Sequence, residues 1–401
     1  MMRILTVVHS LDLGGIESFL LNVFGALDKP DLQLEVCCTG GRVGLLAPEV
    51  RRLGIEVWCC PFRRNALSFR RRFRRELQRR QPFDVVHGHV GHYCGPSLMA
   101  AQQAGVHVRL AHYHNLHPGH KNDWMRRMYD RWMKHMVRRS ATGILACSWA
   151  ALRAHYRDQW KSDERMEVIR LGVPVTALQN ADAREEVRNE FRIAPGARLI
   201  GHIGSFRAQK NHSTLVEVAR RVVDRRPNVR FLLVGDGPLR SQVFDQVRRC
   251  GLCSYVTFAA QRRDVPRLLS AMDLLVLPSL SEGFSLVLIE AQCAGVPVVA
   301  SAAPWAWEAV APAFHTYLRD PFDVTGMAEA ILALLEDAER DPSLSEQARV
   351  FGSQFTIEAS AAAMLAAWGY PGAVAPPDPC EPGLRYLVIT HILRGMPRRG
   401  D

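Results

Sequence analysis

The chain has 401 residues and a mass of 45.0 kDa, with 48% hydrophobic and 23% charged residues, an ordinary globular composition that excludes wholesale disorder and fibrous structure. This length exceeds what one compact core accommodates, so it predicts two domains. The 51 Lys and Arg residues against 40 Asp and Glu residues give a net charge of +11, which favours an anionic ligand or surface as partner without saying which.

Short apolar runs alternate with helical patterns along the first half, which is the rhythm of βαβ units around a parallel sheet. The apolar runs predict strands over residues 4–8, 34–38, 57–60, 84–87, 108–111 and 144–147, and the periodic segments predict helices over 16–27, 45–53, 96–104 and 122–139. A polar, irregular stretch follows over 173–196. A second series then predicts strands over 199–203, 231–234, 256–258, 274–277 and 298–300, with helices over 213–224, 239–250 and 286–294.

This pattern predicts an α/β protein with two Rossmann-like, doubly wound domains that face a central cleft at the carboxyl ends of their strands. The expected boundaries are a first domain over 1–172, a linker over 173–196 and a second domain over 197–345. A C-terminal helix over 346–370 is expected to return to the first domain. The tail over 371–401 is Pro-rich and basic, and we interpret it as irregular rather than as a segment that lies on a membrane.

The ten cysteines stand singly or as two adjacent pairs, without the spacing of a disulfide scaffold, so we expect a reducing cytoplasm. Cys250 and Cys253 have metal-ligand spacing, but no second Cys or His pair follows at zinc-finger distance, and a structural role is favoured. The apolar run over 4–8 is too short for a signal peptide, and no run approaches the roughly 20 apolar residues of a membrane span. The sequence predicts a soluble or peripheral protein.

Two glycine-containing loops carry candidate phosphate contacts. Gly14 and Gly15 open the first predicted helix, where bare backbone N–H groups can approach a phosphate or a sugar, although a tight turn alone would also explain them. In the second half, the loop over 201–211 carries Arg207 and Lys210, which could neutralise a diphosphate as its bond to carbon breaks. Lys210 is the sharper candidate. The turn over 235–238 takes second rank, since backbone geometry explains it equally well.

The strongest signal is the pair Glu282 and Glu290, eight residues apart. Glu282 lies in a loop and Glu290 on the helix that follows, so both could face one ligand over the start of that helix. Free amides over 283–286 suit a phosphate, and a carboxylate at position 290 can accept hydrogen bonds from both hydroxyls of a ribose. A surface role for Glu290 is disfavoured, because it stands between Ile289 and Ala291 in an apolar helix.

Histidines cluster in pairs near predicted strand ends of the first half: His87 with His89, His112 with His114, and His117 with His120. Carboxylate or Cys partners for a metal are not apparent, so we expect no metal and interpret these histidines as hydrogen-bonding groups for a polar ligand. His112 and His114 follow a strand that ends at the predicted cleft.

In order and spacing these motifs resemble glycosyltransferase family 4, the retaining enzymes of the GT-B fold, and most closely the branch that builds capsules and exopolysaccharides. The resemblance extends from Arg3 to about Trp368. It rests on seven motifs: Gly14-Gly15-x-Glu17, Asp84-Val85-Val86-His87-x-His89, His112-x-His114-Asn115, Ala146-Cys147-Ser148, Lys210-Asn211, Gly235-Asp236-Gly237-Pro238 and Glu282-x7-Glu290.

The resemblance implies a metal-independent hexosyltransferase whose donor, a nucleotide sugar, binds the second domain without a cofactor. It places Glu290 on the ribose, the amides around Ser285 and Leu286 on the diphosphate, and Glu282 near the transferred sugar. Lys210 and Arg207 would contact the phosphates, and either His112 or His114 would line the sugar site. The other implied donor-binding residues are Gly14, Gly15, Gly204, Ser205, Arg262, Gly283 and Phe284.

The chain departs from the family pattern at three places. Ser205 stands where many relatives carry Arg, so Arg207 would have to supply that cation. Ala260 and Gln261 replace a Gly and an apolar residue in the loop for the nucleotide base. Residues 302–308 read AAPWAWE where a Gly-rich loop ending in Glu is common.

Arginines gather over residues 63–80 and again over 126–139, on the first half, where the resemblance places the acceptor. In the second group Trp124, Met128, Trp132 and Met136 recur every four residues, a stripe that core packing explains. Core packing does not explain the arginines, which suit an anionic membrane leaflet that bears a lipid-linked acceptor. No nucleic-acid-binding module accompanies this charge, so nucleic acid is not an expected partner.

We therefore expect transfer of a sugar from a UDP-sugar to a lipid-linked or growing saccharide in surface polysaccharide biosynthesis, in the cytoplasm or at the inner face of the cell membrane. Two alternatives stay open at this point: a nucleotide-sugar epimerase of the same fold, and a catalytically silent subunit that binds nucleotide sugars. The sugar, the acceptor, the linkage and the oligomeric state are not specified by the sequence.

Overall fold

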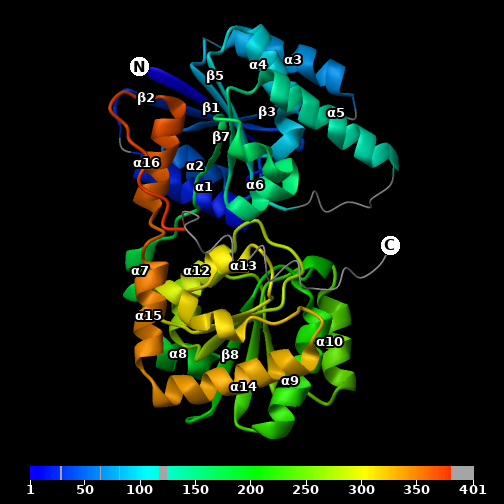
Figure 1. Cartoon of the computed structure of the whole chain (residues 1–401), viewed down its shortest axis with the longest axis vertical. Helices are drawn as coiled ribbons and strands as arrows, with labels where there is room; N and C mark the ends of the chain where they lie inside the picture. The colour runs from blue at the N-terminus through cyan, green and yellow to red at the C-terminus, as the bar shows by residue number, and fades with distance from the viewer. Residues whose placement is uncertain (28, 64, 81, 117–123, 381–401) are drawn as a thin grey trace.

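Two α/β domains are stacked along the long axis of the molecule (Figure 1). The computed structural model describes residues 1–27, 29–63, 65–80, 82–116 and 124–380. His117 and His120 lie outside the described residues. Both domains are built on parallel sheets, which confirms the predicted fold class.

The first domain is built on a seven-stranded sheet in the order β3-β2-β1-β4-β5-β6-β7 over its described residues. Its central strands are almost wholly apolar and buried, as expected where helices cover both faces. The strands are β1 Met2–Val8, β2 Leu32–Cys38, β3 Glu56–Cys59, β4 Val85–Gly88, β5 Val108–Tyr113, β6 Gly143–Ala146 and β7 Met166–Val168. The helices are α1 Gly15–Ala26, α2 Ala47–Arg52, α3 Ala66–Arg79, α4 Gly95–Gln103, α5 Trp124–Ser140 and α6 Trp149–Tyr156, with 3-10 turns at Gly91–Cys94 and Arg157–Lys161.

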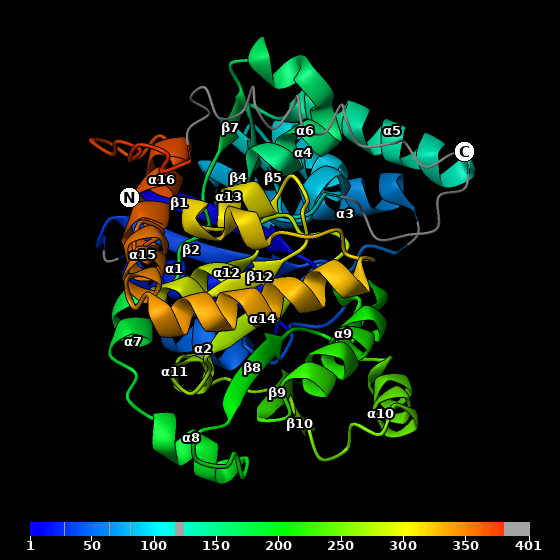
Figure 2. The ribbon, with the colours of Figure 1, turned by 60° about the horizontal axis from the view of Figure 1, so that its bottom comes forward.

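The second domain has a five-stranded sheet in the order β10-β9-β8-β11-β12 over its described residues. Helices α9 and α14 run side by side on it (Figure 2). The strands are β8 Arg198–Ile203, β9 Val229–Val234, β10 Val256–Ala259, β11 Leu274–Leu277 and β12 Val298–Ala300. The helices are α9 His212–Arg225, α10 Arg240–Arg249, α11 Val265–Ser270, α12 Leu286–Cys293, α13 Ala306–Ala309, α14 Val324–Arg340 and α15 Ser343–Gly352, with 3-10 turns at Ala208–Lys210 and Pro312–Tyr317.

The expected linker is more regular than its polar sequence suggested. It contains two short helices, α7 Val175–Gln179 and α8 Arg184–Glu190. Both pack against α11, and α7 also packs against α12, so this segment is attached to the second domain. The sequence pattern did not indicate these helices, because each spans too few residues to show a helical period.

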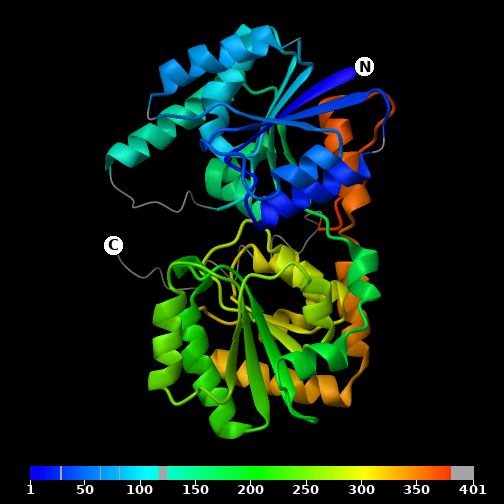
Figure 3. The same cartoon turned by 180° about the vertical axis from the view of Figure 1, so that it is seen from behind.

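The single C-terminal helix expected over 346–370 is two helices. Helix α15 packs against α12 of the second domain, and α16, Ile357–Trp368, packs against α1 of the first (Figure 3). The break lies where the chain crosses between the domains, and the Thr356 hydroxyl caps α16 by accepting a hydrogen bond from the Ala359 N–H over 3.0 Å. Gly369 ends the helix in the left-handed conformation at φ 72°.

The arginine-rich segment after residue 65 forms α3. Its buried residues, Ala66, Phe69, Phe73 and Leu77, recur every three or four positions and so line one face, while arginines cover the other. The Asn65 side chain accepts hydrogen bonds from the N–H groups of Leu67 and Ser68, which starts the helix.

Helix α5 overturns the interpretation of its stripe as core. Met136 is buried, but Trp124, Met128 and Trp132 are 68%, 56% and 41% exposed. Only the last part of α5 packs against α4, and its first part projects beyond the domain (Figure 1). An exposed apolar face flanked by arginines is what the structure presents.

No helix within the described part of the chain is both long and apolar enough to cross a membrane.

Candidate active site at the domain boundary

The start of α12 offers free backbone amides. The preceding residues 281–285, here called the donor loop, end at Ser285, which has an extended backbone at ψ 98° and makes no capping bond with its side chain. The Ser285 hydroxyl is buried without a hydrogen-bond partner among the described residues. The first N–H groups of a helix lack intrahelical acceptors and carry the positive end of the helix dipole, so this position suits an anion such as a phosphate.

Glu290 lies one turn further along α12, four residues after Leu286, and therefore on the same side of the helix. No ion pair or hydrogen bond joins its carboxylate to another described side chain. Burial raises the pKa of this carboxyl to about 7, because nothing compensates the loss of water around the charged form. A desolvated carboxylate without a partner is well suited to accept hydrogen bonds from two ligand hydroxyls.

Lys210 and Glu282 meet at the entrance to the donor loop. The Lys210 Nζ lies 2.6 Å from the Glu282 Oε1, and the two side chains are only 15% and 11% exposed. Gly204 makes room for this lysine, since a Cβ at that position would lie 3.1 Å from the Lys210 Cδ and Cε. The structure thus brings together the loop cation and the first carboxylate of the sequence motif.

The first domain meets this site at two places. A Cβ on Gly15 would lie 3.6 Å from the Leu286 Cδ1, so the start of α1 faces the start of α12. Gly283 lies so close to the His114 carbonyl that any side chain there would overlap it. Gly14 and Gly15 are exposed, as an approach to a ligand phosphate requires.

Four buried histidines stand at the carboxyl ends of β4 and β5. His89 Nδ1 lies 2.9 Å from His114 Nε2, and the His87 and His112 rings stack at 5.4 Å. His114 is 9% exposed and adjoins the donor loop, whereas His112 is fully buried. Of the two sugar-site candidates, His114 is the one that reaches the domain boundary.

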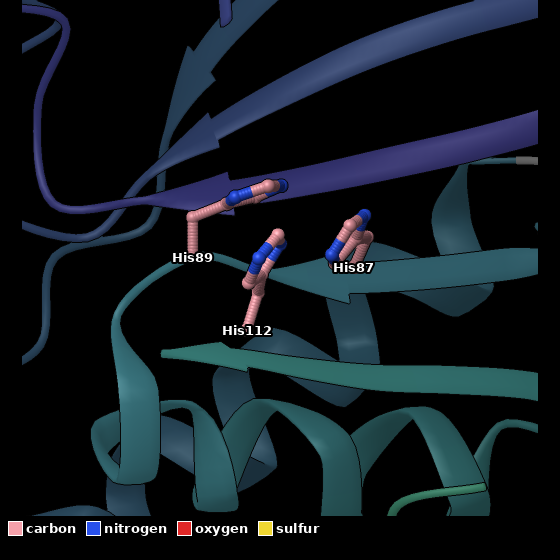
Figure 4. Close-up of side chains that lie close together, drawn as sticks. All are labelled: His87, His89 and His112. Carbon is pink, nitrogen blue, oxygen red and sulfur yellow. The ribbon is translucent and has the colours of Figure 1, made fainter. Parts of the chain in front are cut away.

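Three of these rings resemble a metal site at first sight. His87, His89 and His112 each offer one nitrogen within 4.8 Å of the others, and Figure 4 shows their rings side by side. However, the Trp368 Nε1–H donates to the His87 Nδ1 over 3.0 Å, so the proton of the neutral His87 ring must sit on Nε2. A metal needs a free ring lone pair, so His87 does not fit as a ligand in this arrangement. The expectation of a metal-free site stays a prediction.

Because these histidines are buried, we expect the free energy of unfolding to decrease as the pH falls. Burial lowers the pKa of both His87 and His114 to about 3, below the value near 6.5 of the unfolded chain. Their contribution is therefore complete above pH 6.5 and lost as the pH falls toward 3. Urea unfolding should show that the His114→Asn variant loses about 2 kcal/mol less between pH 7.5 and 5 than the wild type.

The control for this titration is His107→Asn, which replaces an exposed histidine of the same domain. It should show the same pH dependence of the unfolding free energy as the wild type. Equal pH dependence in His114→Asn and the wild type would contradict a neutral, buried His114.

Three of the predicted site residues form no hydrogen bond or ion pair with the donor loop within the described part of the chain: Arg207, Ser205 and Arg262. Arg207 and Ser205 are exposed, and no ion pair joins Arg207 to another described residue. Arg262 pairs with Glu190 at 2.6 Å and with Asp264 at 2.7 Å, and these partners raise its pKa. Its guanidinium is thus bound within its own domain. The turn over 235–238 supports the loop that carries Lys210, because a Cβ on Gly235, which has φ 141°, would overlap the Gly204 carbonyl.

A buried network beside the donor loop was not foreseen. Arg170 pairs with Glu308 at 2.6 Å and with Asp378 at 2.8 Å, and its Cζ lies 5.5 Å from the centre of the Phe284 ring. Neither Arg170 nor Asp378 belongs to a motif in the sequence. Their positions far apart in the chain gave no signal, whereas Glu308 did appear as the end of the unusual 302–308 loop.

Two family models match successive parts of the chain. The model described as glycosyl transferase 4-like domain matches residues 14–172, and the model described as glycosyl transferases group 1 matches residues 183–351. The two matches correspond to the two structural domains, and together they include every candidate site residue named above except Asp378.

Similar proteins include bacterial glycosyltransferases. The Bacillus subtilis protein EpsF is 29% identical over 75% of this chain and 79% of its own length. The Escherichia coli UDP-Gal:alpha-D-GlcNAc-diphosphoundecaprenol alpha-1,3-galactosyltransferase is 23% identical over 81% of this chain and 86% of its own. Among solved structures, Anabaena Alr3699/HepE in complex with UDP and glucose superposes with a TM-score of 0.77 at 22% identity, over 92% of this chain and all of that one.

Proposed function

The chain is a glycosyltransferase built from a glycosyl transferase 4-like domain and a glycosyl transferases group 1 domain, and we propose that it transfers a sugar from a UDP-sugar to a lipid-linked or growing saccharide, with retention of configuration. One observation carries the proposal: the N-terminal amides of α12 lack intrahelical acceptors, and Glu290, whose carboxylate pairs with no other described side chain, lies on the same side of the helix, next to Lys210 and Glu282. The α12 amides match a diphosphate and Glu290 matches a ribose. Lys210 and Glu282 match the bond between phosphate and sugar.

The roles follow from charge. As the bond between the sugar and the diphosphate breaks, negative charge develops on the phosphate, and the Lys210 ammonium and the α12 amides stabilise it without a metal. His114 is assigned to the hydroxyls of the transferred sugar, because it is neutral and adjoins the donor loop. The mechanism assigns no covalent nucleophile and no cofactor.

UDP as the nucleotide is supported by the relatives. Anabaena Alr3699/HepE was solved with UDP-glucose, and the Escherichia coli galactosyltransferase uses UDP-Gal and a diphosphoundecaprenol-linked acceptor. A lipid-linked acceptor fits the excess of arginine on the first domain of this chain.

A nucleotide-release assay tests the proposal. Purified protein incubated with UDP-glucose, UDP-galactose or UDP-N-acetylglucosamine should release UDP faster when a lipid-linked saccharide extract from a polysaccharide-producing bacterium is added. Appearance of a second UDP-sugar without acceptor would instead identify an epimerase. UDP binding without turnover against any acceptor would identify a silent binding subunit.

We also propose that the first domain binds the cytoplasmic face of an anionic membrane through α3 and α5. The apolar residues Trp124, Met125, Met128 and Trp132 are 41–68% exposed on α5. The exposed cations of α3 and α5 that form no ion pair with other described residues include Arg71, Arg74, Arg75, Arg127, Arg131 and Arg139. Helix α4 packs against both α3 and α5, so these three helices belong to one layer of the first domain. Apolar side chains rimmed by cations are typical of an interfacial surface.

Sedimentation with phosphatidylglycerol vesicles should show binding at low salt that weakens at high salt. Replacing Trp124 and Trp132 with Ser should reduce the bound fraction several-fold, because each indole inserts apolar area into the interface. Phe244→Ser, which removes a 52% exposed aromatic residue from the second domain, is the matched control and should bind as the wild type does. No binding of the wild type at low salt would refute the membrane proposal.

A further inference from the structure

Asp378 lies in the Pro-rich segment that follows α16, yet it is part of a buried network at the domain boundary. Its carboxylate accepts hydrogen bonds from the Arg170 Nε at 2.8 Å and the Arg170 Nη2 at 3.0 Å, a bidentate pair. It also accepts one from the Trp149 Nε1 at 3.1 Å. The side chains of Arg170 and Asp378 are 8% and 15% exposed, so water screens this pair weakly.

Arg170 extends the network into the second domain. Its Nη1 donates to the Glu308 Oε2 over 2.6 Å. The same carboxylate accepts hydrogen bonds from the backbone N–H groups of Trp149 and Ala150, at 2.9 and 2.7 Å, and so satisfies the start of α6. Burial would lower the pKa of Arg170, but Glu308 and Asp378 raise it, so the guanidinium stays charged. Three segments distant in the sequence are thereby fixed to one another.

Two residues, Arg170 and the α6 cap Ser148, connect this network to the donor loop. The Arg170 guanidinium lies over the Phe284 ring, which also packs against Phe355 at 5.4 Å between ring centres. Ser148, the N-cap of α6, donates its hydroxyl to the Gly283 carbonyl over 2.5 Å. The donor loop is therefore bound on one side through Phe284 and on the other through Gly283.

We propose that Asp378 and Arg170 are positioning residues that hold the donor loop in the conformation that binds a nucleotide sugar. This inference rests on the proposed function. Asp378 does not touch the ligand site. It orients Arg170, which orders Phe284 and Glu308, and Glu308 in turn orders the start of α6 with its cap Ser148. Without the Asp378 carboxylate the donor loop is less ordered before binding. Part of the binding free energy of the nucleotide sugar then offsets the entropy lost when the loop becomes ordered.

Calorimetry with UDP and donor kinetics test the inference. Asp378→Asn should raise the Kd for UDP and the KM for the UDP-sugar about 10-fold, with kcat changed less than about 2-fold, since the loop is ordered once donor is bound. Ser148→Ala should have the same effect, because it removes the bond to Gly283. Tyr370→Phe is the matched control. It removes a bond from the same segment to Asp31, at 2.6 Å, that does not involve Arg170, and it should bind UDP as the wild type does.

The outcomes distinguish failure of the proposed function from failure of the positioning role. If the wild type binds no UDP, the proposed function fails. If the wild type binds UDP and Asp378→Asn and Ser148→Ala bind it equally well, only the positioning role fails. If Asp378→Asn does not fold, Ser148→Ala decides, because its substitution removes one hydroxyl and no charge.

Discussion

Lys210→Met is expected to lower kcat by about 100- to 1,000-fold while the protein stays folded, the cost typical of removing one preorganised group that stabilises developing negative charge. The Lys210 ammonium is the cation that the structure places beside Glu282 and the donor loop, at 2.6 Å from the Glu282 Oε1. Single-turnover measurement of UDP release at saturating donor would report the chemical step itself.

A double variant resolves the ambiguity of this substitution. Lys210→Met alone leaves the Glu282 carboxylate, 11% exposed, without its partner, which is destabilising in itself. In Lys210→Met with Glu282→Gln, that charge is gone, and the slow chemical step should persist. Recovery of wild-type kcat in the double variant would mean that Lys210 only neutralises Glu282. Lys161→Met, on the first domain, is the control and should keep full activity.

Glu290→Gln is expected to lower kcat/KM for the donor about 100-fold. A hydrogen bond to a charged group is worth about 1.5–3 kcal/mol, and the carboxylate is placed to accept two of them from a ribose. The substitution keeps the shape of the side chain and should leave the thermal midpoint of the free protein unchanged or slightly higher, because it removes a desolvated charge. Glu217→Gln, at an exposed position on α9, is the matched control.

The same residue predicts a pH dependence of binding. Burial raises the pKa of Glu290 to about 7, so its ionised form declines as the pH falls below 7. Donor affinity of the wild type should fall between pH 7.5 and 5.5, and that of Glu290→Gln should change less. Equal pH profiles of Kd in the two proteins would argue against contact between Glu290 and the donor.

Periodicity predicted the two parallel sheets correctly, because each strand and helix depends on a short stretch of chain. The structure also places the Lys210 Nζ 2.6 Å from the Glu282 Oε1, whereas the binding roles of Lys210, Glu282 and Glu290 stay predictions. In the structure Gly15 faces Leu286 across the domain boundary, and it was the resemblance that had assigned both residues to the donor. The sequence resemblance supplied the roles of these residues, and periodicity did not.

The features that the sequence did not predict depend on contacts between segments far apart in the chain. The stripe on α5 has the spacing of a buried face, but among the described residues Met136 is buried whereas Trp124 is 68% exposed. Asp378 stands in a Pro-rich segment without helical or strand pattern, and its pairing with Arg170 arises from the path of the chain after α16. Choosing between His112 and His114 likewise required the position of the donor loop.

Thermal unfolding with a panel of nucleotides tests the central claim most directly. UDP and UDP-sugars, present at about one hundred times their dissociation constants, should stabilise the wild type by about 2.7 kcal/mol. Glu290→Gln should be stabilised much less at the same concentrations. Equal stabilisation of both proteins, or no stabilisation of the wild type by any UDP-sugar, would contradict a donor site on α12.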